Sequence, residues 1–225
     1  MTCRFWARRI SCAPKIIEVM KSKPRIFVYK MTADNGGAPC LMNDLLSLAI
    51  CKPKIRHKAK VGDWIIGLGG KHLGDGIIYV AQVTGTAGAE YYRDRDFARR
   101  PDCIYHFREG GLTRKKSAAY HEDPANMATD VGTAPEYRNA RVLLSLDFRY
   151  FGKKREAMPP ALKAFADSIG RGHRVNHDPA RRRALVSLIG RLWRKHTGPT
   201  VIGEPHSKPD ASVCCSRDEG TAECH

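Results

Sequence analysis

Residues 62–83 read GDWIIGLGGKHLGDGIIYVAQV and contain two apolar runs, Trp64–Leu68 and Ile77–Val83. Short apolar runs rich in β-branched residues and bounded by glycine are typical of strands. The glycine-rich GGKHLGDG between them predicts a long hairpin rather than a phosphate-binding loop. Lys71 is followed by His72, so no Ser or Thr hydroxyl is placed for magnesium, and no helix N-terminus follows to hold an anion.

Further strands and helices surround this hairpin. Strands are predicted over residues 26–29, 104–107 and 142–150. Helices are predicted over 41–51, where Leu41, Leu45, Leu46 and Ala49 recur at helical spacing before Pro53, and over 89–98, 159–170 and 179–196. The polar residues 111–139 read as a long loop. This order indicates an α+β fold, built as a small, mixed, partly closed β-barrel with inserted and C-terminal helices.

The domain organisation follows from composition. Residues 1–22 are predicted to be a basic, disordered N-terminal arm, residues 23–206 a single domain, and residues 207–225 a disordered tail. No apolar run is long enough to span a membrane, and the N-terminus lacks the apolar centre of a signal peptide. The eight cysteines form no CxxC pair, which is typical of free thiols in a reducing compartment. We therefore expect a cytoplasmic protein without a metal or cofactor.

The basic residues are unevenly distributed along the chain. The net charge is +16, with +7 in residues 1–30, +3 in residues 31–150, +9 in residues 151–200 and −3 in residues 201–225. Such a field attracts polyanions, and without a long apolar segment nucleic acid is a better candidate than a membrane.

Residues 52–60 place a cation at every second position: Lys52, Lys54, Arg56, Lys58 and Lys60. If the segment is extended, all five cations share one face and suit a polyanion, although an edge strand protected by lysines would look the same. Lys71 could lie near the same ligand. In the motif RGHR, Arg171, His173 and Arg174 suit a phosphate, although a solvated turn is equally consistent.

The stretches YKMTADNGGAPC, LAICKPKIRHKAKVGDWIIGLGGK, IIYVAQVT, RVLLSLDFRYFG and RGHR, with the late GEP, resemble the nucleotide modification associated domain 2 family. The resemblance runs from about residue 26 to residue 206. It implies an association with phage and bacterial systems that modify nucleic-acid bases. The two strands of the hairpin also resemble, by fold analogy, the small PUA and EVE barrels. Gly37 departs from the family, where an aromatic residue is expected, and His57 stands where a second arginine is common.

Two functional hypotheses follow from the resemblance and the charge distribution. In the first, the domain binds nucleic acid or a nucleotide: the basic residues hold phosphate, and a pocket formed by Asp34, Gly36, Pro39 and Trp64 takes a base. In the second, it is an enzyme acting on a nucleobase or nucleotide precursor, with acid, base or nucleophile drawn from Asp34, Cys51, His121 and His173. A buried cysteine is more often an inert apolar group. A third hypothesis is that helix 179–196 docks a protein partner, although packing on its own domain is favoured.

Overall fold

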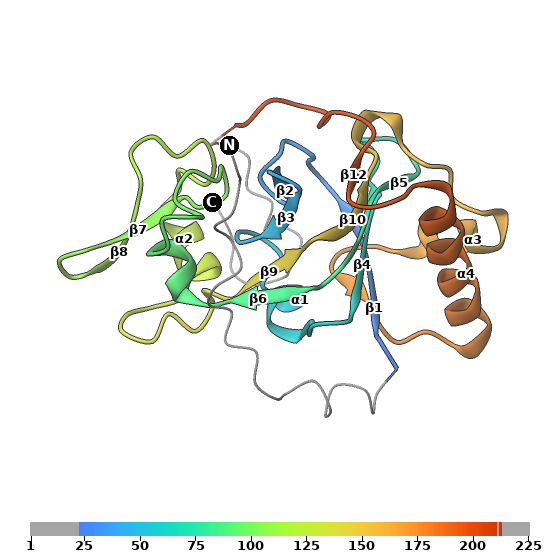
Figure 1. Ribbon diagram of the computed structural model, residues 1–225, viewed down its shortest axis with the longest axis horizontal. Coiled ribbons are helices and arrows are strands. Elements are labelled where there is room, and N and C mark those ends of the chain that lie inside the picture. Colours follow the sequence, from blue (N-terminus) through green and yellow to red (C-terminus); the bar gives the residue numbers. More distant parts are fainter. Residues whose placement is uncertain (1–22, 211, 213–225) are drawn as a thin grey trace, which may run out of the picture.

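The computed structural model describes residues 23–210 and residue 212, and Figure 1 shows how their elements are arranged. Their strands form three sheets and are interspersed with short helices, followed by two longer helices near the end, so the α+β class is confirmed. The predicted arm, residues 1–22, and the end of the predicted tail lie outside the described residues. Among the described residues, no helix has the length and apolar character needed to cross a membrane.

A six-stranded sheet forms the centre of the fold, in the order β11-β1-β4-β5-β10-β12. Its strands are β1 (Ile26–Met31), β4 (Trp64–Gly69), β5 (Ile77–Gln82), β10 (Asp147–Tyr150), β11 (His173–Arg174) and β12 (Thr200–Val201). β4 and β5 pair antiparallel, which confirms the predicted hairpin, and β1 pairs parallel with β4.

The two faces of this sheet bury different cores, because successive side chains of a strand point in opposite directions. Ile26 and Val28 of β1 pack with the helices, whereas Phe27 and Tyr29 belong to the core on the other face. The helices are α3 (Pro160–Ser168) and α4 (Pro179–Lys195). The predicted cap of α4 is confirmed, since Asp178 Oδ1 accepts a 2.8 Å hydrogen bond from Arg181 N.

The second sheet has four strands, in the order β2-β3-β9-β6. They are β2 (Cys40–Met42), β3 (Leu45–Leu48), β9 (Val142–Ser145) and β6 (Gly85–Ala87). The helix predicted over 41–51 is therefore wrong. Asn43 and Asp44 have φ values of 52° and 56°, and two consecutive left-handed residues make the tight turn of a two-residue hairpin.

The run predicted as one strand over 142–150 is two strands, β9 and β10, which belong to different sheets. Leu146 lies between them and is 60% exposed. The chain thus passes from the four-stranded to the six-stranded sheet at this point. The partly closed barrel is not found, because the described strands form three separate sheets and no closed barrel. The likeness to PUA and EVE barrels stays a prediction.

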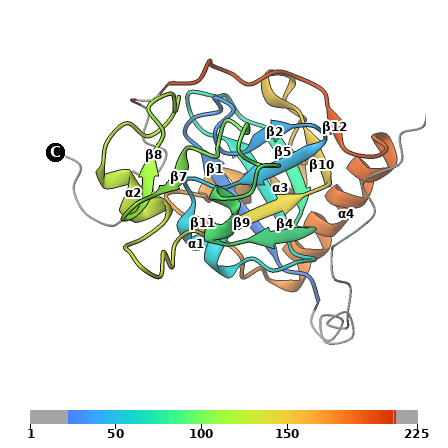
Figure 2. The ribbon, with the colours of Figure 1, turned by 60° about the vertical axis from the view of Figure 1, so that its left-hand side comes forward.

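A third region contains the hairpin of β7 (Tyr105–Arg108) and β8 (Gly111–Arg114), together with α2 (Ala125–Asp130). The prediction that residues 111–139 form one long loop is therefore only partly right, because β8 and α2 lie within them. Figure 1 places this region on the opposite side of the molecule from α3 and α4, and Figure 2 shows it on the side away from α4. The short 3-10 helices η2 (Ala89–Tyr92) and η3 (Gly152–Lys154) complete the described elements, and η2 stands where a helix was predicted over 89–98.

The basic residues 52–60 are not extended, so the prediction of a row of cations on one face is wrong. They contain α1 (Pro53–Lys58), with Pro53 in the first turn, where its missing N–H costs nothing. In a helix, residues two positions apart are rotated by about 200°, so Lys54 and Arg56 point in opposite directions. Lys54, Lys58 and Lys60 are exposed, whereas Lys52 and Arg56 are buried.

Candidate active site

Two of the predicted catalytic candidates, Cys51 and His121, meet a residue that was not predicted, Asp130, beside the start of α1. Cys51 Sγ lies 3.1 Å from His121 Nε2, and His121 Nδ1 lies 2.6 Å from Asp130 Oδ2. All three residues are buried, with exposed fractions of at most 1%. Cys51 precedes α1, His121 lies between β8 and α2, and Asp130 ends α2. The chain therefore brings a thiol, an imidazole and a carboxylate into one line of hydrogen bonds.

The carboxylate of Asp130 orients this line. Its Oδ2 accepts from Tyr105 OH at 2.8 Å as well as from His121, and its Oδ1 accepts from the backbone N–H of Cys51 at 2.9 Å. An ionised carboxylate only accepts hydrogen bonds, so His121 Nδ1 carries the proton and Nε2 is left as an acceptor for the thiol. Burial and the charge of Asp130 raise the pKa of Tyr105, which keeps this phenol protonated as a donor.

The backbone at this site is held in an uncommon conformation. Cys51, Lys52 and His121 have φ values of 57°, 44° and 51°. Left-handed conformations of residues other than glycine cost about 1–3 kcal/mol each and concentrate at functional sites. The two segments that supply the thiol and the imidazole are thus both strained where they meet.

Arg56 is structural rather than ligand-binding, because its guanidinium donates hydrogen bonds to backbone carbonyls of the protein itself. Nε donates to Cys51 O at 2.6 Å, Nη1 to the carbonyls of Asn139 and Arg141 at 2.8 and 2.7 Å, and Nη2 to Asp130 O at 3.0 Å. Its charge also lies 3.9 Å from Asp130 Oδ1. The prediction that Arg56 holds phosphate is wrong in geometry, and the residue instead fixes the backbone of Cys51 and Asp130.

A second buried carboxylate, Asp34, lies in its own network. Its Oδ1 accepts from Tyr150 OH at 2.6 Å, and its Oδ2 lies 2.9 Å from His206 Nδ1. Arg155 Nη1 lies 3.2 Å from His206 Nε2 and can only donate, so Nδ1 of His206 is protonated and donates to Asp34. Burial and Asp34 raise the pKa of Tyr150.

Chain neighbours of the site residues connect the Asp34 network to the Cys51 site: Lys52 follows Cys51, and Tyr120 precedes His121. Lys52 Nζ lies 5.2 Å from the centroid of the Tyr29 ring, and Tyr29 OH is 2.9 Å from Tyr79 OH. On the other side, Tyr120 OH donates to Asn35 O at 3.0 Å. Asn35 is 3% exposed, and its Nδ2 has no hydrogen-bond acceptor among the described residues. The two carboxylates thus belong to one polar region inside the core.

The residues predicted to form a base pocket are only partly brought together. Gly36 and Gly37 pack on Tyr120, whose ring occupies the space a side chain at position 37 would need. Pro39 follows a cis peptide bond in the same loop. Trp64 is elsewhere: its ring packs 4.8 Å from that of Trp193, on the helix-covered face of the sheet. Trp64 is therefore no neighbour of the Asp34 loop.

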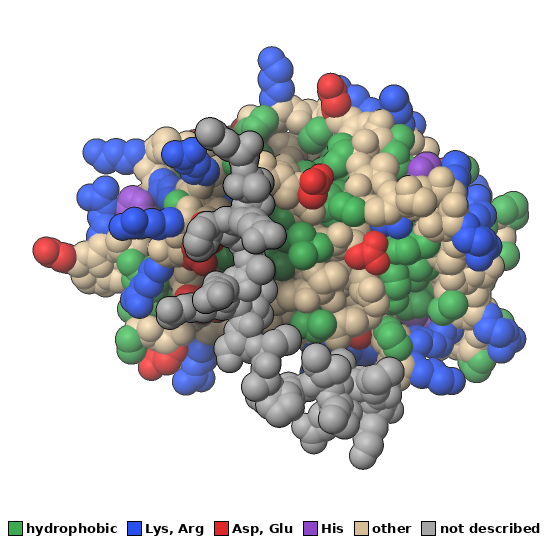
Figure 3. All heavy atoms as spheres, viewed as in Figure 1, with side chains coloured by type: hydrophobic (Ala, Val, Ile, Leu, Met, Phe, Trp, Pro, Cys, Tyr) green, Lys and Arg blue, Asp and Glu red, His purple; other side chains and the backbone are tan. Residues whose placement is uncertain are grey.

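The remaining predicted phosphate ligands are scattered. Lys71 is exposed in the β4–β5 turn, and Arg171 and Arg174 are exposed around β11, where His173 pairs with Tyr29 and packs 5.6 Å from the Phe27 ring. Figure 3 shows Lys and Arg gathered at both ends of one face, around β7–β8 and around α3 and α4, rather than in one stripe.

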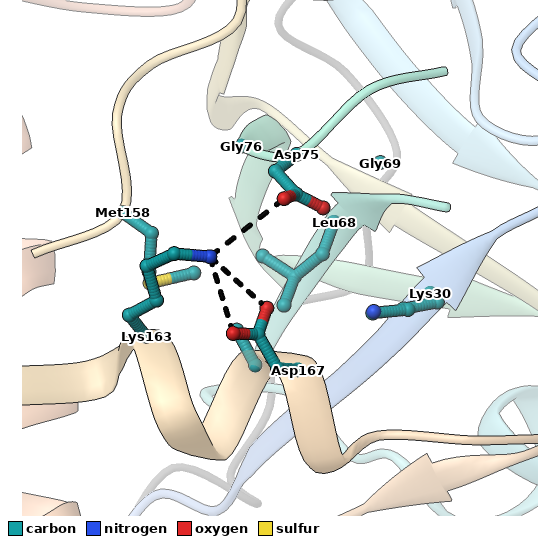
Figure 4. A pocket seen from close by; sticks show the side chains of 9 residues that line it. Lys30, Leu68, Gly69, Asp75, Gly76, Met158, Lys163 and Asp167 are labelled. Atoms are coloured by element: carbon teal, nitrogen blue, oxygen red, sulfur yellow. Dashed lines mark hydrogen bonds and ion pairs between the residues drawn. The ribbon is translucent and has the colours of Figure 1, made fainter. Parts of the chain in front are cut away.

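A small hollow between β4, the β4–β5 turn and α3 has a volume of about 20 Å³. In Figure 4 the Lys163 ammonium points between Asp75 and Asp167, at 3.7 and 3.1 Å. This space suits no more than a water molecule and is not a candidate site. Within residues 23–210 and 212, no three His, Cys, Asp or Glu side chains are grouped to hold a metal ion.

Sequence reasoning missed Asp130, Tyr105 and His206. Asp130 lies in the polar stretch read as a loop, and Tyr105 in a predicted strand. No local pattern marks either residue, because their partners are separated from them in the sequence. Asp130 could have been suspected only by asking which carboxylate would orient His121.

The chain belongs to the nucleotide modification associated domain 2 family, which it matches over residues 23–210. This finding confirms the resemblance and associates the domain with nucleotide modification. No match was found among curated proteins or among solved structures.

Proposed function

We propose that the protein is a thiol-dependent enzyme that modifies a nucleobase or nucleotide, with Cys51 as nucleophile, His121 as general base and Asp130 as the residue that orients His121. The observation that supports this most is the continuous line from Cys51 Sγ through the His121 ring to Asp130. A nucleophile within reach of a base that is itself oriented by a third group is the arrangement of covalent catalysis.

A purely structural role explains the same contacts less well. A thiol is a weak hydrogen-bonding group, so a buried cysteine gains little stability from an imidazole. The strained backbone at Cys51, Lys52 and His121 would be a cost without a corresponding gain. Both features are expected if the site is built for reactivity.

The first step can be written from these residues. His121 Nε2 takes the proton of the Cys51 thiol, and Asp130 stabilises the imidazolium that forms. The sulfur then bonds to an electrophilic carbon of the substrate as a π bond to that carbon breaks, and the electron pair moves to an electronegative atom of the substrate. His121 then gives its proton to the atom that received the electron pair, or back to the sulfur when the adduct breaks down. The addition therefore requires no oxidant or reductant.

The alternative of a base-binding domain that holds phosphate with residues 52–60 has less support. Its geometric basis was an extended row of five cations, and two of them, Lys52 and Arg56, are buried. Nucleic acid remains a predicted partner through the exposed Lys54, Lys58 and Lys60.

Mass analysis of nucleosides from cells that express the full chain or its Cys51→Ser variant tests the proposal. We expect a mass-shifted nucleoside with the natural chain and none with the variant, at equal levels of folded protein. Cys103→Ser is the matched control, because Cys103 is equally buried but lies outside the site. The proposal would be contradicted if cells with Cys51→Ser contained the same amount of the mass-shifted nucleoside as cells with the natural chain.

A further inference from the structure

An open hollow of about 450 Å³ lies beside the candidate active site. It is bordered by α1, by residues 86–90 and by residues 136–141, and its lining includes His57, Glu136, Arg138 and Arg141. Sites for small molecules and cofactors commonly have volumes of about 300–1,000 Å³. The hollow is therefore large enough for a nucleotide.

Two arginines of the lining retain unused donors. Arg141 Nη2 donates to Ala59 O at 3.1 Å, and its Nη1 forms no hydrogen bond among the described residues. Its Nε is buried and is not counted as a donor to the hollow. Arg138 is exposed and forms no ion pair within the described part of the chain. Guanidinium groups bind phosphate through paired N–H donors, so this wall suits a phosphate group.

The same hollow also contains two carboxylates. Glu90 Oε1 accepts a 2.6 Å hydrogen bond from Gly88 N, and Glu136 is exposed. Acids beside arginines disfavour a bare anion but suit a ligand that carries hydroxyl or amino donors together with its phosphate. A nucleotide has this combination, since its sugar and base supply donors and its phosphate is the acceptor.

The wall that carries Arg141 is fixed to the candidate active site through Arg56. The Arg56 guanidinium donates to the carbonyls of Asn139 and Arg141 on one side and of Cys51 and Asp130 on the other. Neither Cys51 nor His121 lines the hollow, so the two sites are neighbours and not one cavity.

We propose that this hollow is a nucleotide-binding site, in which Arg138 and Arg141 hold the phosphate. The choice of a nucleotide as ligand rests on the proposed function, but binding itself uses no residue of the Cys51 site.

Isothermal titration calorimetry of the full chain with nucleoside 5′-monophosphates tests this site. We expect binding that weakens at least tenfold in Arg138→Glu and in Arg141→Gln. The parent nucleosides and inorganic phosphate should each bind at least tenfold more weakly than the monophosphate. Arg138→Glu alone is decisive if Arg141→Gln fails to fold, because the exposed Arg138 side chain forms no hydrogen bond or ion pair among the described residues.

Two control variants separate this proposal from that of catalysis. Arg183→Glu makes the same charge change at an exposed position of α4 and should leave binding unchanged. Cys51→Ala should also bind normally, whether or not Cys51 is catalytic. A short single-stranded oligonucleotide that binds and is lost in Arg138→Glu would support the site and identify a polynucleotide as the source of the phosphate. Equal binding by Arg138→Glu and the natural chain, or equal binding of nucleoside and monophosphate, would overturn the proposal.

Discussion

Asp130 and Asp102 are both buried, and each has a tyrosine, an arginine and a cysteine nearby. They differ in whether a histidine lies between the carboxylate and the thiol. Asp102 accepts a hydrogen bond from Tyr91 OH at 2.8 Å and lies 3.5 Å from the Arg100 guanidinium. The negative charge of Asp102 also acts on the Cys40 thiol. Asp130 likewise has Tyr105, Arg56 and Cys51 around it. At Asp130, however, the His121 ring stands between carboxylate and thiol.

Under the proposed function, this difference distinguishes a cluster that only stabilises the fold from one that supports catalysis. Burial and the charge of Asp102 raise the pKa of the Cys40 thiol, so Cys40 stays protonated and unreactive. Arg100 donates to the carbonyls of Cys40, Met42 and Leu45, which joins β2 and β3 to the Asp102 cluster. Cys51 instead has an acceptor for its proton. A single histidine thus distinguishes two otherwise comparable sets of residues.

The largest expected effect on the rate is that of removing the Cys51 thiol, and removal of the Cys40 thiol is its matched control. Cys51→Ser should lower the rate of nucleotide modification about a thousandfold or more, because nucleophile removal abolishes covalent catalysis. Cys40→Ser should leave the rate per folded molecule within about threefold, since Cys40 has no base beside it. Equal losses in both variants would erase the distinction between the clusters.

The next effect concerns the base. His121→Gln removes the group that accepts the thiol proton and should lower the rate about a hundredfold to ten-thousandfold. Circular dichroism would confirm that the variant keeps its fold. A His121→Gln enzyme with the rate of the natural chain would show that His121 is only a packing residue.

The Asp102 cluster should reveal itself through stability. Asp102→Asn leaves Arg100 without its buried counter-charge, and breaking such a pair costs about 3–5 kcal/mol of unfolding free energy. Urea denaturation measures this change. The account would be weakened if Asp102→Asn unfolded like the natural chain but lost activity.

The smallest effect is a dependence of stability on alkaline pH. The folded chain raises the pKa of Cys40 above its ordinary value of 9.0, so the unfolded chain releases this proton first. The corresponding stability is complete below about pH 9 and is lost at higher pH, by at most about 1.4 kcal/mol per pH unit for one group. Urea midpoints measured from pH 8 to pH 10 should fall less steeply for Cys40→Ala, and an identical slope would show that Cys40 does not contribute.

Local sequence patterns predicted the parts of the fold that depend on neighbouring residues. The β4–β5 hairpin and α4 with its Asp178 cap were recognisable because glycine, proline and apolar periodicity act over a few positions. The β2–β3 hairpin was missed because Asn43 and Asp44 interrupt leucines that also fit a helical spacing. The alternation of cations in residues 52–60 was misread because Pro53 begins a helix as readily as it ends one.

The candidate site was predictable only as a set of chemical types. Cys51, His121 and Asp34 were named from their reactivity, whereas their grouping depends on contacts between distant segments. Cys51 and His121 are 70 positions apart, and the burial of Arg56 depends on residues more than 70 positions later. A single sequence does not encode such distances in any local pattern.

The most direct measurement of the central claim is the rate at which iodoacetamide labels each cysteine at pH 7, followed by peptide mass mapping. Cys40, Cys51 and Cys103 are all buried, so each digest contains its own controls. We expect Cys51 to be labelled at least ten times faster than Cys40 and Cys103, and this advantage to disappear in His121→Ala. Equal labelling of the three thiols, or a Cys51 rate that does not change in His121→Ala, would contradict the assignment of Cys51 as an activated nucleophile.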